Sequence, residues 1–232
     1  MTVGMIAALD TTDLDKARCW ATAIAPHCSL FKLGLEFFLA NGAAGYRAIA
    51  GRPVFLDLKL HDIPVTVAGA VRAVLPLRPR MLTIHAAGTA GMITAARHAA
   101  EAAGSERPLL LGVTVLTSID AAALATIGVT GSPAEQVLRL ARLALDAGAD
   151  GVVCSPLEVA MLRAALGREP TLVVPGIRPT GAATDDQARV MTPREAVAAG
   201  ADWIVVGRPI TGAADPGAAA AAIASEIAAE IA

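Results

Sequence analysis

Charged residues are scarce in this chain of 232 residues: they make up 17%, against an average of about 25%, while hydrophobic residues make up 55%. This composition predicts a large interior and argues against disorder. The net charge is -2 and no block of basic residues occurs, so nothing favours binding to nucleic acid or to an anionic membrane surface. The three cysteines lack metal-ligand spacing. So sparse a set fits a reducing cytoplasm, where we expect the protein to work.

Signals for export or membrane insertion are also missing. The first ten residues contain no basic region, so we expect no signal peptide there. Apart from weakly hydrophobic alanine runs, no stretch of about 18 apolar residues lacks a break or a charge, and we expect no membrane span. Met1 and a helix-forming segment at 218–232 lead us to expect a complete chain.

Short apolar runs recur along the whole chain, with stretches of helical period between most of them. Several of the intervening helices begin with Ser or Thr, then Pro, then Glu two residues later, which is the pattern of a capping box. These starts are Ser132–Glu135, Ser155–Glu158 and Thr192–Glu195, with Thr12–Asp15 as a weaker version. The runs, which we predict to be strands, are Met5–Leu9, Leu30–Leu33, Val54–Leu56, Met81–Ile84, Leu109–Leu116, Gly151–Val153, Leu172–Val174 and Trp203–Val206.

The spacing of these units indicates the fold. Ala-Gly-Ala-Asp occurs at 147–150 and at 199–202, each time before a Val-Val strand, and its glycine is expected to end a helix. Eight strand–helix units of roughly 29 residues match a (β/α)8 TIM barrel, an α/β fold of about 250 residues. No linker divides the chain, so we predict a single barrel domain over 1–232. An open doubly wound sheet is the alternative, but no Gly-x-Gly-x-x-Gly turn supports it.

The segment from Asp57 to Thr66 is the most informative part of the chain. A buried strand leads into Asp57-Leu-Lys59-Leu-His-Asp62, where polarity begins abruptly. Asp57 and Lys59 share a face if the strand continues, because residues two apart point the same way. Charges grouped so tightly beside an apolar strand are costly to bury without pairing, and such groups cluster at functional sites. A structural ion-pair network at a barrel rim is the alternative interpretation.

Polar residues follow nearly every other predicted strand. In a TIM barrel the active site lies at these carboxyl-terminal ends, and the loops after the last two strands often hold phosphate. Arginines and glycines in those two loops suit a phosphate dianion, and the long segment from Pro175 to Met191 is expected to be a lid. His85 is expected to be a hydrogen-bonded barrel histidine. The polar strand-end residues are Asp10, Lys32, His85, Thr117, Arg178 and Arg208, with Gly176 and Gly207 beside the arginines.

Taken in order, these pieces resemble orotidine 5'-monophosphate decarboxylase over nearly the whole chain. A single piece is weak, but together, on the predicted strand ends, they are specific. The matching pieces are Ala-Leu-Asp10, Lys32-Leu-Gly34, Asp57-Leu-Lys59-Leu-His-Asp62-Ile-Pro-Val-Thr66, His85-Ala-Ala-Gly88, Val-Leu-Thr117-Ser, Pro175-Gly-Ile-Arg178-Pro and Val-Gly207-Arg208-Pro-Ile.

The resemblance implies decarboxylation of orotidine 5'-monophosphate to UMP, the last step of de novo pyrimidine synthesis. Lys59 would stabilise the C6 carbanion and protonate it. Lys32, Asp57, Lys59 and Asp62 would form a catalytic network of alternating charge, an example of electrostatic preorganisation. No metal, flavin, pyridoxal phosphate or thiamine is implied.

The resemblance also assigns binding roles and a partner. Asp10 and Lys32 would contact the ribose, and Thr117 the pyrimidine. Gln187, Arg208 and the Gly207 amide would hold phosphate, joined by Arg178 as the lid closes. Asp62 and Thr66 would reach into the neighbouring subunit's site, so a homodimer is expected.

Two rival functions remain open. Mg2+-dependent sugar-phosphate enzymes, namely 3-keto-gulonate-phosphate decarboxylase and hexulose-phosphate synthase, share the barrel and the Asp-x-Lys-x-x-Asp motif. They carry Glu where Lys32 stands, and a lysine there would repel the metal. A non-catalytic nucleotide-phosphate-binding barrel would need the arginines but would have little use for Lys59.

Overall fold

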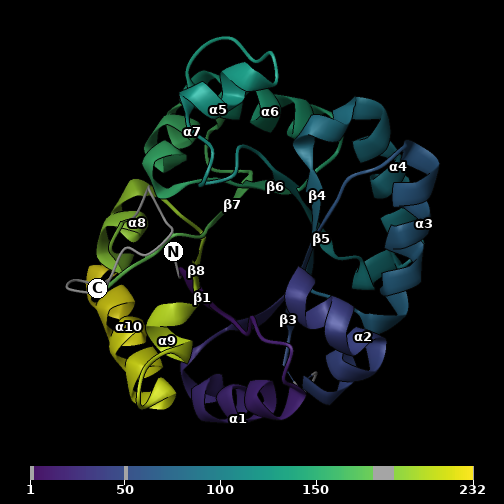
Figure 1. Cartoon of the computed structure of the whole chain (residues 1–232). Helices are drawn as coiled ribbons and strands as arrows, with labels where there is room; N and C mark the ends of the chain where they lie inside the picture. Colours follow the sequence, from purple (N-terminus) through teal and green to yellow (C-terminus); the bar gives the residue numbers. More distant parts are fainter. Residues whose placement is uncertain (1–2, 50–51, 180–190, 232) are drawn as a thin grey trace.

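The computed structural model describes residues 3–49, 52–179 and 191–231. Its centre is a closed barrel of parallel strands in the order β1 to β8, ringed by helices (Figure 1). The predicted (β/α)8 barrel is therefore confirmed. The strands are β1 Gly4–Ala8, β2 Leu30–Gly34, β3 Val54–Leu60, β4 Met81–His85, β5 Leu109–Val113, β6 Gly151–Val153, β7 Thr171–Val174 and β8 Trp203–Val206.

Each strand is followed by at least one helix, and the last helix packs against the first, which closes the outer ring (Figure 1). The predicted closing helix is present as α10. The helices are α1 Leu14–Ile24, α2 Leu35–Ile49, α3 Pro64–Val74, α4 Thr89–Glu101, α5 Ala121–Thr126, α6 Pro133–Asp146, α7 Val159–Leu166, α8 Pro193–Ala199, α9 Arg208–Thr211 and α10 Pro216–Ile231.

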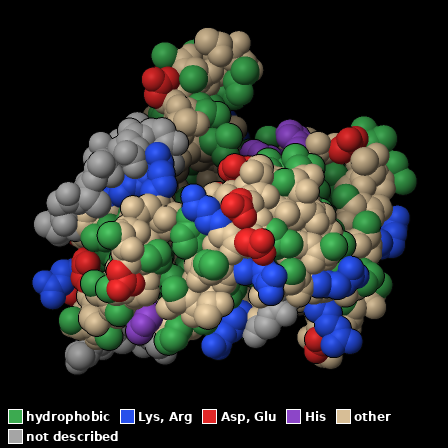
Figure 2. Space-filling view, turned by 60° about the horizontal axis from the view of Figure 1, so that its bottom comes forward, with side chains coloured by type: hydrophobic (Ala, Val, Ile, Leu, Met, Phe, Trp, Pro, Cys, Tyr) green, Lys and Arg blue, Asp and Glu red, His purple; other side chains and the backbone are tan. Residues whose placement is uncertain are grey.

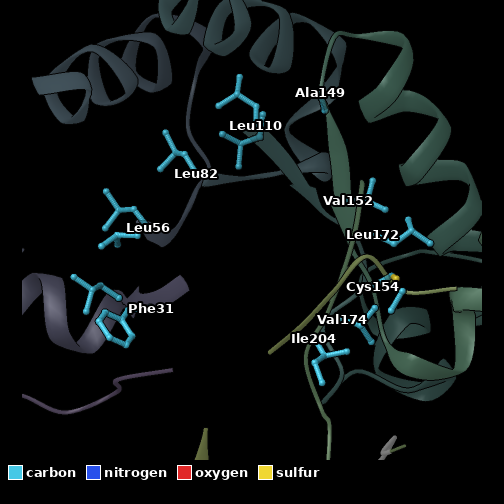
Figure 3. Packing of buried hydrophobic residues seen from close by; sticks show 14 of the residues in the cluster. Phe31, Leu56, Leu82, Leu110, Ala149, Val152, Cys154, Leu172, Val174 and Ile204 are labelled. Carbon is cyan, nitrogen blue, oxygen red and sulfur yellow. The ribbon is translucent and has the colours of Figure 1, made fainter. Parts of the chain in front are cut away.

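Two apolar layers lie on opposite faces of the strands. The outer layer packs against the helices and includes Leu56, Leu82, Leu110 and Leu172 (Figure 3). The inner layer fills the barrel with side chains such as Leu30, Phe55, Met81 and Leu111. Successive side chains on a strand alternate between its two faces. A residue two positions from an inner residue on the same strand therefore also points into the barrel.

Most of the predicted element boundaries agree with the structure. Capping boxes are present at Ser132, Ser155 and Thr192, as expected. The cap predicted at Thr12 is wrong by one residue, because the Asp13 carboxylate accepts the Lys16 N–H at 3.0 Å. The fifth strand was predicted too long, because it ends at Val113 and not at Leu116.

The repeated Ala-Gly-Ala-Asp segment builds the same feature twice at the amino-terminal ends of the strands. Gly148 and Gly200 both have φ near +102°, a conformation that favours glycine, and both lie in the turn after a helix. Asp150 then accepts the Leu110 N–H, and Asp202 accepts the Leu172 N–H, each at 2.8 Å. Each aspartate thereby ties its own strand to the preceding one.

Arginines complete these two connections. Arg107 donates two hydrogen bonds to the Asp150 carboxylate at 2.7 and 2.8 Å, and Arg97 adds a third at 3.1 Å. Arg163 pairs with Asp202 and also donates to the Gly200 carbonyl at 2.7 Å. We call these two groups the Arg–Asp clamps.

The face in Figure 2 shows basic and acidic side chains interspersed, in keeping with the small net charge. Within the described residues, no helix is both long enough and apolar enough to cross a membrane.

Candidate active site

A cavity of about 490 Å³ opens at the carboxyl-terminal ends of the strands. Its lining combines charged side chains from β2 and β3 with apolar side chains from β5, β6 and β8, including Val113, Val153 and Val205. Such a mixture suits a ligand with both polar and apolar parts. The predicted site residues that line the cavity are Asp10, Lys32, Asp57, Lys59, Thr117, Arg178, Gly207 and Arg208.

The strand pattern places Lys32 and Asp57 inside the top of the barrel. Leu30 and Phe55 belong to the inner apolar layer, and Lys32 and Asp57 lie two residues further along the same strands. Both side chains therefore point inward. They are also nearly buried, with 11% and 10% of the side-chain surface exposed.

Two lysines of the predicted network share the carboxylate of Asp57. Lys59 Nζ lies 2.7 Å from Asp57 Oδ2, and Lys32 Nζ lies 3.6 Å from the same oxygen. Lys32 Nζ also donates to Asp10 Oδ1 at 2.9 Å. Among the described residues, Lys59 Nζ pairs with Asp57 alone, so the ammonium keeps donors available for a ligand in the cavity.

These contacts keep both buried partners charged. Burial by itself would lower the pKa of Lys32, but the charges of Asp57 and Asp10 outweigh burial and raise it above its ordinary value. Burial would likewise raise the pKa of Asp57, but Lys32, Lys59 and the hydrogen bond from Thr83 bring it below its ordinary value. The cavity thus contains fixed charges before any ligand binds.

Lys59 takes an unusual backbone conformation within β3. Its φ is +49°, which costs a non-glycine residue about 1–3 kcal/mol. The pairing of β3 with β4 shifts register between Leu56 and Leu60, so the strand carries an irregularity where Lys59 lies. A strained backbone of this kind at a cavity is typical of a functional site.

Thr83, on β4, supports this irregularity and was missed by the sequence analysis. Its buried hydroxyl accepts the Lys59 N–H at 2.8 Å and donates to Asp57 Oδ1 at 2.9 Å. A signal existed in the sequence, because Thr83 follows inward-facing Met81 by two residues and is thus a polar residue facing into the barrel.

Gly34 was quoted only as part of a motif, but the structure gives it a steric reason. A Cβ atom at Gly34 would lie 2.7 Å from Asp10 Oδ1 and 3.0 Å from Lys32 Nζ. Any side chain there would displace the ion pair between those two groups.

The loops after β7 and β8 add two arginines to the lining of the cavity. Arg208 is the first residue of α9, directly after Gly207 at the end of β8. Arg178 is 8% exposed, and its Nη1 donates to the Ile177 carbonyl at 3.0 Å. The Arg178 N–H donates to the Met191 carbonyl at 3.0 Å, so the two ends of the expected lid segment meet here.

Asp62 and Thr66 lie apart from the ion pairs of Lys32, Asp57 and Lys59 in this chain. Asp62 is exposed before α3, where its Oδ1 accepts the Ile63 N–H at 2.6 Å, and within the described residues it forms no ion pair. Thr66 is exposed on the first turn of α3. Gln187 lies outside the described residues.

His85 lies at the end of β4, with its ring 5.3 Å from that of His61. Burial, together with His61 and Lys59, lowers the pKa of His85, so it is neutral near pH 7. The part of the chain that the structure describes contains no group of three or more His, Cys, Asp or Glu residues suited to a metal ion.

Known proteins are similar to this chain in both sequence and fold. Residues 4–223 match the family described as "Orotidine 5'-phosphate decarboxylase / HUMPS family". The chain is 57% identical to the orotidine 5'-phosphate decarboxylase of Gluconobacter oxydans, with 97% of each chain covered. It is 54% identical to that of Thermobifida fusca, over 98% of this chain and 97% of the other.

A solved structure agrees with these relatives. The orotidine 5'-phosphate decarboxylase of Lactobacillus acidophilus superposes with a TM-score of 0.86 at 39% identity, over 97% of this chain and 99% of that one. Together with the barrel and the cavity at its carboxyl-terminal end, these matches show that the chain belongs to the orotidine 5'-phosphate decarboxylase / HUMPS family.

Proposed function

We propose that this protein is a carboxy-lyase that converts orotidine 5'-monophosphate to UMP. The observation that carries the proposal is the Asp57 carboxylate shared by Lys59 and Lys32 at the cavity, in a chain whose relatives bear the name of this activity. We refer to Lys32, Asp57 and Lys59 as the Lys–Asp network.

The chemistry requires a cation and a proton at one place. When the bond between C6 and the carboxylate breaks, CO2 leaves and its bonding electrons remain on C6. The Lys59 ammonium lowers the energy of that carbanion and then gives C6 a proton, which completes UMP. Asp57 holds Lys59 in position and lies near the departing carboxylate. No cofactor is required for this sequence of steps.

We propose for these residues the binding roles that the family resemblance implies, and the presence of most of them in the cavity lining supports this assignment. Asp10 and Lys32 contact the ribose hydroxyls, and Thr117 contacts the pyrimidine. Arg208, the Gly207 amide and Arg178 hold the phosphate, and Gln187 joins them from the lid segment. Phosphate binding far from C6 can then contribute to closure around the pyrimidine.

The direct test is to follow the ultraviolet absorbance of orotidine 5'-monophosphate with purified protein and no added metal. We expect conversion to UMP that EDTA does not reduce, and no conversion by the Lys59→Ala variant with its fold intact. Absence of turnover by the wild-type protein, or near-wild-type turnover by Lys59→Ala, would contradict the proposal.

A metal-dependent sugar-phosphate reaction is the second candidate, because the Asp-x-Lys-x-x-Asp motif is shared with such enzymes. Lys32 opposes it: the ammonium lies 3.6 Å from Asp57, where it would repel a divalent cation. A requirement for Mg2+ in the absorbance assay would favour this candidate instead.

We further propose that the protein acts as a homodimer in which Asp62 and Thr66 complete the partner's site. The support is their exposure beside Ile63 and Val65, which are 62% and 69% exposed in the single chain. Two apolar side chains so exposed next to predicted site residues suit a subunit contact.

Mixed dimers test this arrangement. A Lys59→Ala chain and an Asp62→Ala chain, each inactive alone, should regenerate some activity when combined, because one site of the mixed dimer contains both wild-type residues. Heterodimers demonstrated by mass spectrometry but without any recovered activity would exclude shared sites.

Two broader expectations are also proposals: residues 1–232 form one domain, and the protein works in the cytoplasm. Three free cysteines, with Cys154 buried, suit a reducing compartment. Resistance of the whole chain to limited proteolysis would support the single domain.

A further inference from the structure

We propose that Thr83 is a positioning residue for the decarboxylation, acting through Asp57 and Lys59 without touching the substrate. The inference rests on the proposed function. Thr83 lies on β4, its side chain is fully buried, and it does not line the cavity. Whatever it contributes to the reaction must therefore pass through its two hydrogen-bond partners.

The Thr83 hydroxyl uses both of its roles on the network. A hydroxyl has one proton to donate and lone pairs with which to accept. Thr83 Oγ1 donates its proton to Asp57 Oδ1 at 2.9 Å and accepts the backbone N–H of Lys59 at 2.8 Å. One side chain thus binds the carboxylate of one network residue and the backbone of another.

The first contact sets the rotation of the carboxylate. With Oδ1 bound to Thr83, Oδ2 is the oxygen that faces both lysines, at 2.7 Å from Lys59 and 3.6 Å from Lys32. Without the hydroxyl, the Asp57 carboxylate could turn about its terminal torsion, which is broad for aspartate. Its shared contact with the two lysines would then no longer be fixed.

The second contact sets the backbone of Lys59. The β3–β4 ladder is interrupted between Leu56 and Leu60, so the Lys59 N–H lacks its regular partner and a side-chain acceptor takes it. Lys59 at φ +49° would otherwise be free to return to an extended backbone, which would redirect its ammonium.

The test compares Thr83→Val, which keeps the shape but removes both hydrogen bonds, with Thr83→Ser, which keeps the hydroxyl. We expect Thr83→Val to lower kcat by about 10- to 100-fold, the cost of a misplaced catalytic group, with KM nearly unchanged. Thr83→Ser should recover most of the loss. Because the hydroxyl stabilises the Asp57 carboxylate, the acid limb of the kcat profile of Thr83→Val should move to higher pH.

Thr114 provides a matched control on the adjacent strand end. It is also a buried threonine, and its hydroxyl donates to the Val153 carbonyl at 2.9 Å, away from the network. Thr114→Val should lower Tm about as much as Thr83→Val while keeping kcat and the acid limb.

Three results would overturn the proposal: wild-type kcat in Thr83→Val, an equal loss of kcat in Thr114→Val, or no recovery in Thr83→Ser. A wild-type protein that fails to decarboxylate orotidine 5'-monophosphate refutes the proposed function instead, so the two failures are distinguishable. In that case a crystal structure of Thr83→Val still reports whether Asp57 and Lys59 move.

Discussion

At the amino-terminal ends of the strands, Asp150 and Asp202 are paired with arginines, whereas at the carboxyl-terminal ends Asp57 is paired with lysines. Both regions hold an aspartate that is largely removed from solvent among cations, yet only the second region lines the cavity. The choice of cation separates a structural ion pair from a catalytic one.

In the clamp around Asp150, the hydrogen-bonding capacity of the carboxylate is filled. Asp150 accepts from two arginines and from the Leu110 N–H, and each bond ties a helix or loop to a strand end. A guanidinium is planar, binds with two donors and does not release its proton. The Arg–Asp clamps are therefore rigid and chemically inert.

In the Lys–Asp network, the Lys59 ammonium keeps hydrogen-bond donors that Asp57 does not use. The Lys59 ammonium has three donors, pairs with Asp57 among the described residues, and can give up a proton. Its backbone is held in a strained conformation, whereas the clamps place positive φ at glycines. The Lys–Asp network thus carries backbone strain at a lysine, whereas the turns of the two clamps take positive φ at glycines, where it costs little.

The largest predicted effect comes from making the network resemble a clamp. Lys59→Arg keeps a cation beside Asp57 but removes a group that can donate its proton, so we expect kcat to fall by about 10⁴-fold, the upper range for general acid catalysis. Tm should change little, because the ion pair is kept. Steady-state assays and thermal unfolding measure the two quantities, and a variant with more than a tenth of wild-type kcat would refute the role of Lys59 as proton donor.

Removing the charge of an aspartate should lower activity in the Lys–Asp network but stability in the Arg–Asp clamps. Asp57→Asn is expected to lower kcat by about 10²- to 10³-fold, as for loss of one preorganised electrostatic group. Asp150→Asn should keep kcat and lose about 2 kcal/mol of stability through its weakened charged hydrogen bonds, a fall in Tm of roughly 6 °C. The comparison fails if Asp150→Asn loses activity at temperatures where it stays folded.

The sequence was sufficient to predict the barrel and most of the cavity lining, because both depend on local patterns. Polar residues that follow an apolar run reveal a strand end, and a (β/α)8 fold brings all such ends together. Lys32 and Asp57 meet for this reason although they are distant in sequence.

What the sequence did not reveal depends on contacts between strands. The φ of Lys59 and the register shift beside it arise from the fit of β3 against β4, and Thr83 acquires a role only through that fit. The Arg–Asp clamps were equally hidden. The repeated Ala-Gly-Ala-Asp predicted helix ends, but not that its aspartate bonds to a neighbouring strand.

Gly34→Ala should disturb the edge of the Lys–Asp network and leave the clamps intact. The added methyl would meet Asp10 Oδ1 at 2.7 Å, so the carboxylate must leave its position against Lys32. We expect kcat/KM to fall by roughly 10-fold, within the range for a small misplacement. If Asp10 carries the effect, Gly34→Ala should cost little more in an Asp10→Asn background, and fully additive losses in this double-mutant cycle would disprove the steric link.

Acid should erase the stability difference between the wild type and Asp150→Asn. Burial would raise the pKa of Asp150, but hydrogen bonds from Arg107 and Leu110 outweigh it and lower that pKa. A depressed carboxyl pKa stabilises the fold above the unfolded value of about 3.9, and that contribution disappears as pH falls through the folded value. Tm measured from pH 7 downward should therefore converge for the two proteins, and a constant gap would contradict the assigned charge state.

The smallest effect is expected from making a clamp resemble the network. Arg107→Lys keeps the charge beside Asp150 but loses the paired donors at 2.7 and 2.8 Å, while Arg97 and the Leu110 N–H still bind the carboxylate. We expect a loss of about 1 kcal/mol, one hydrogen bond's worth, without change in kcat. Arg107→Lys and Lys59→Arg exchange the same two cations in opposite directions. Denaturant unfolding measures the first variant, and activity assays measure the second. If both variants lost stability and neither lost activity, the cation would not be what distinguishes the two ends of the barrel.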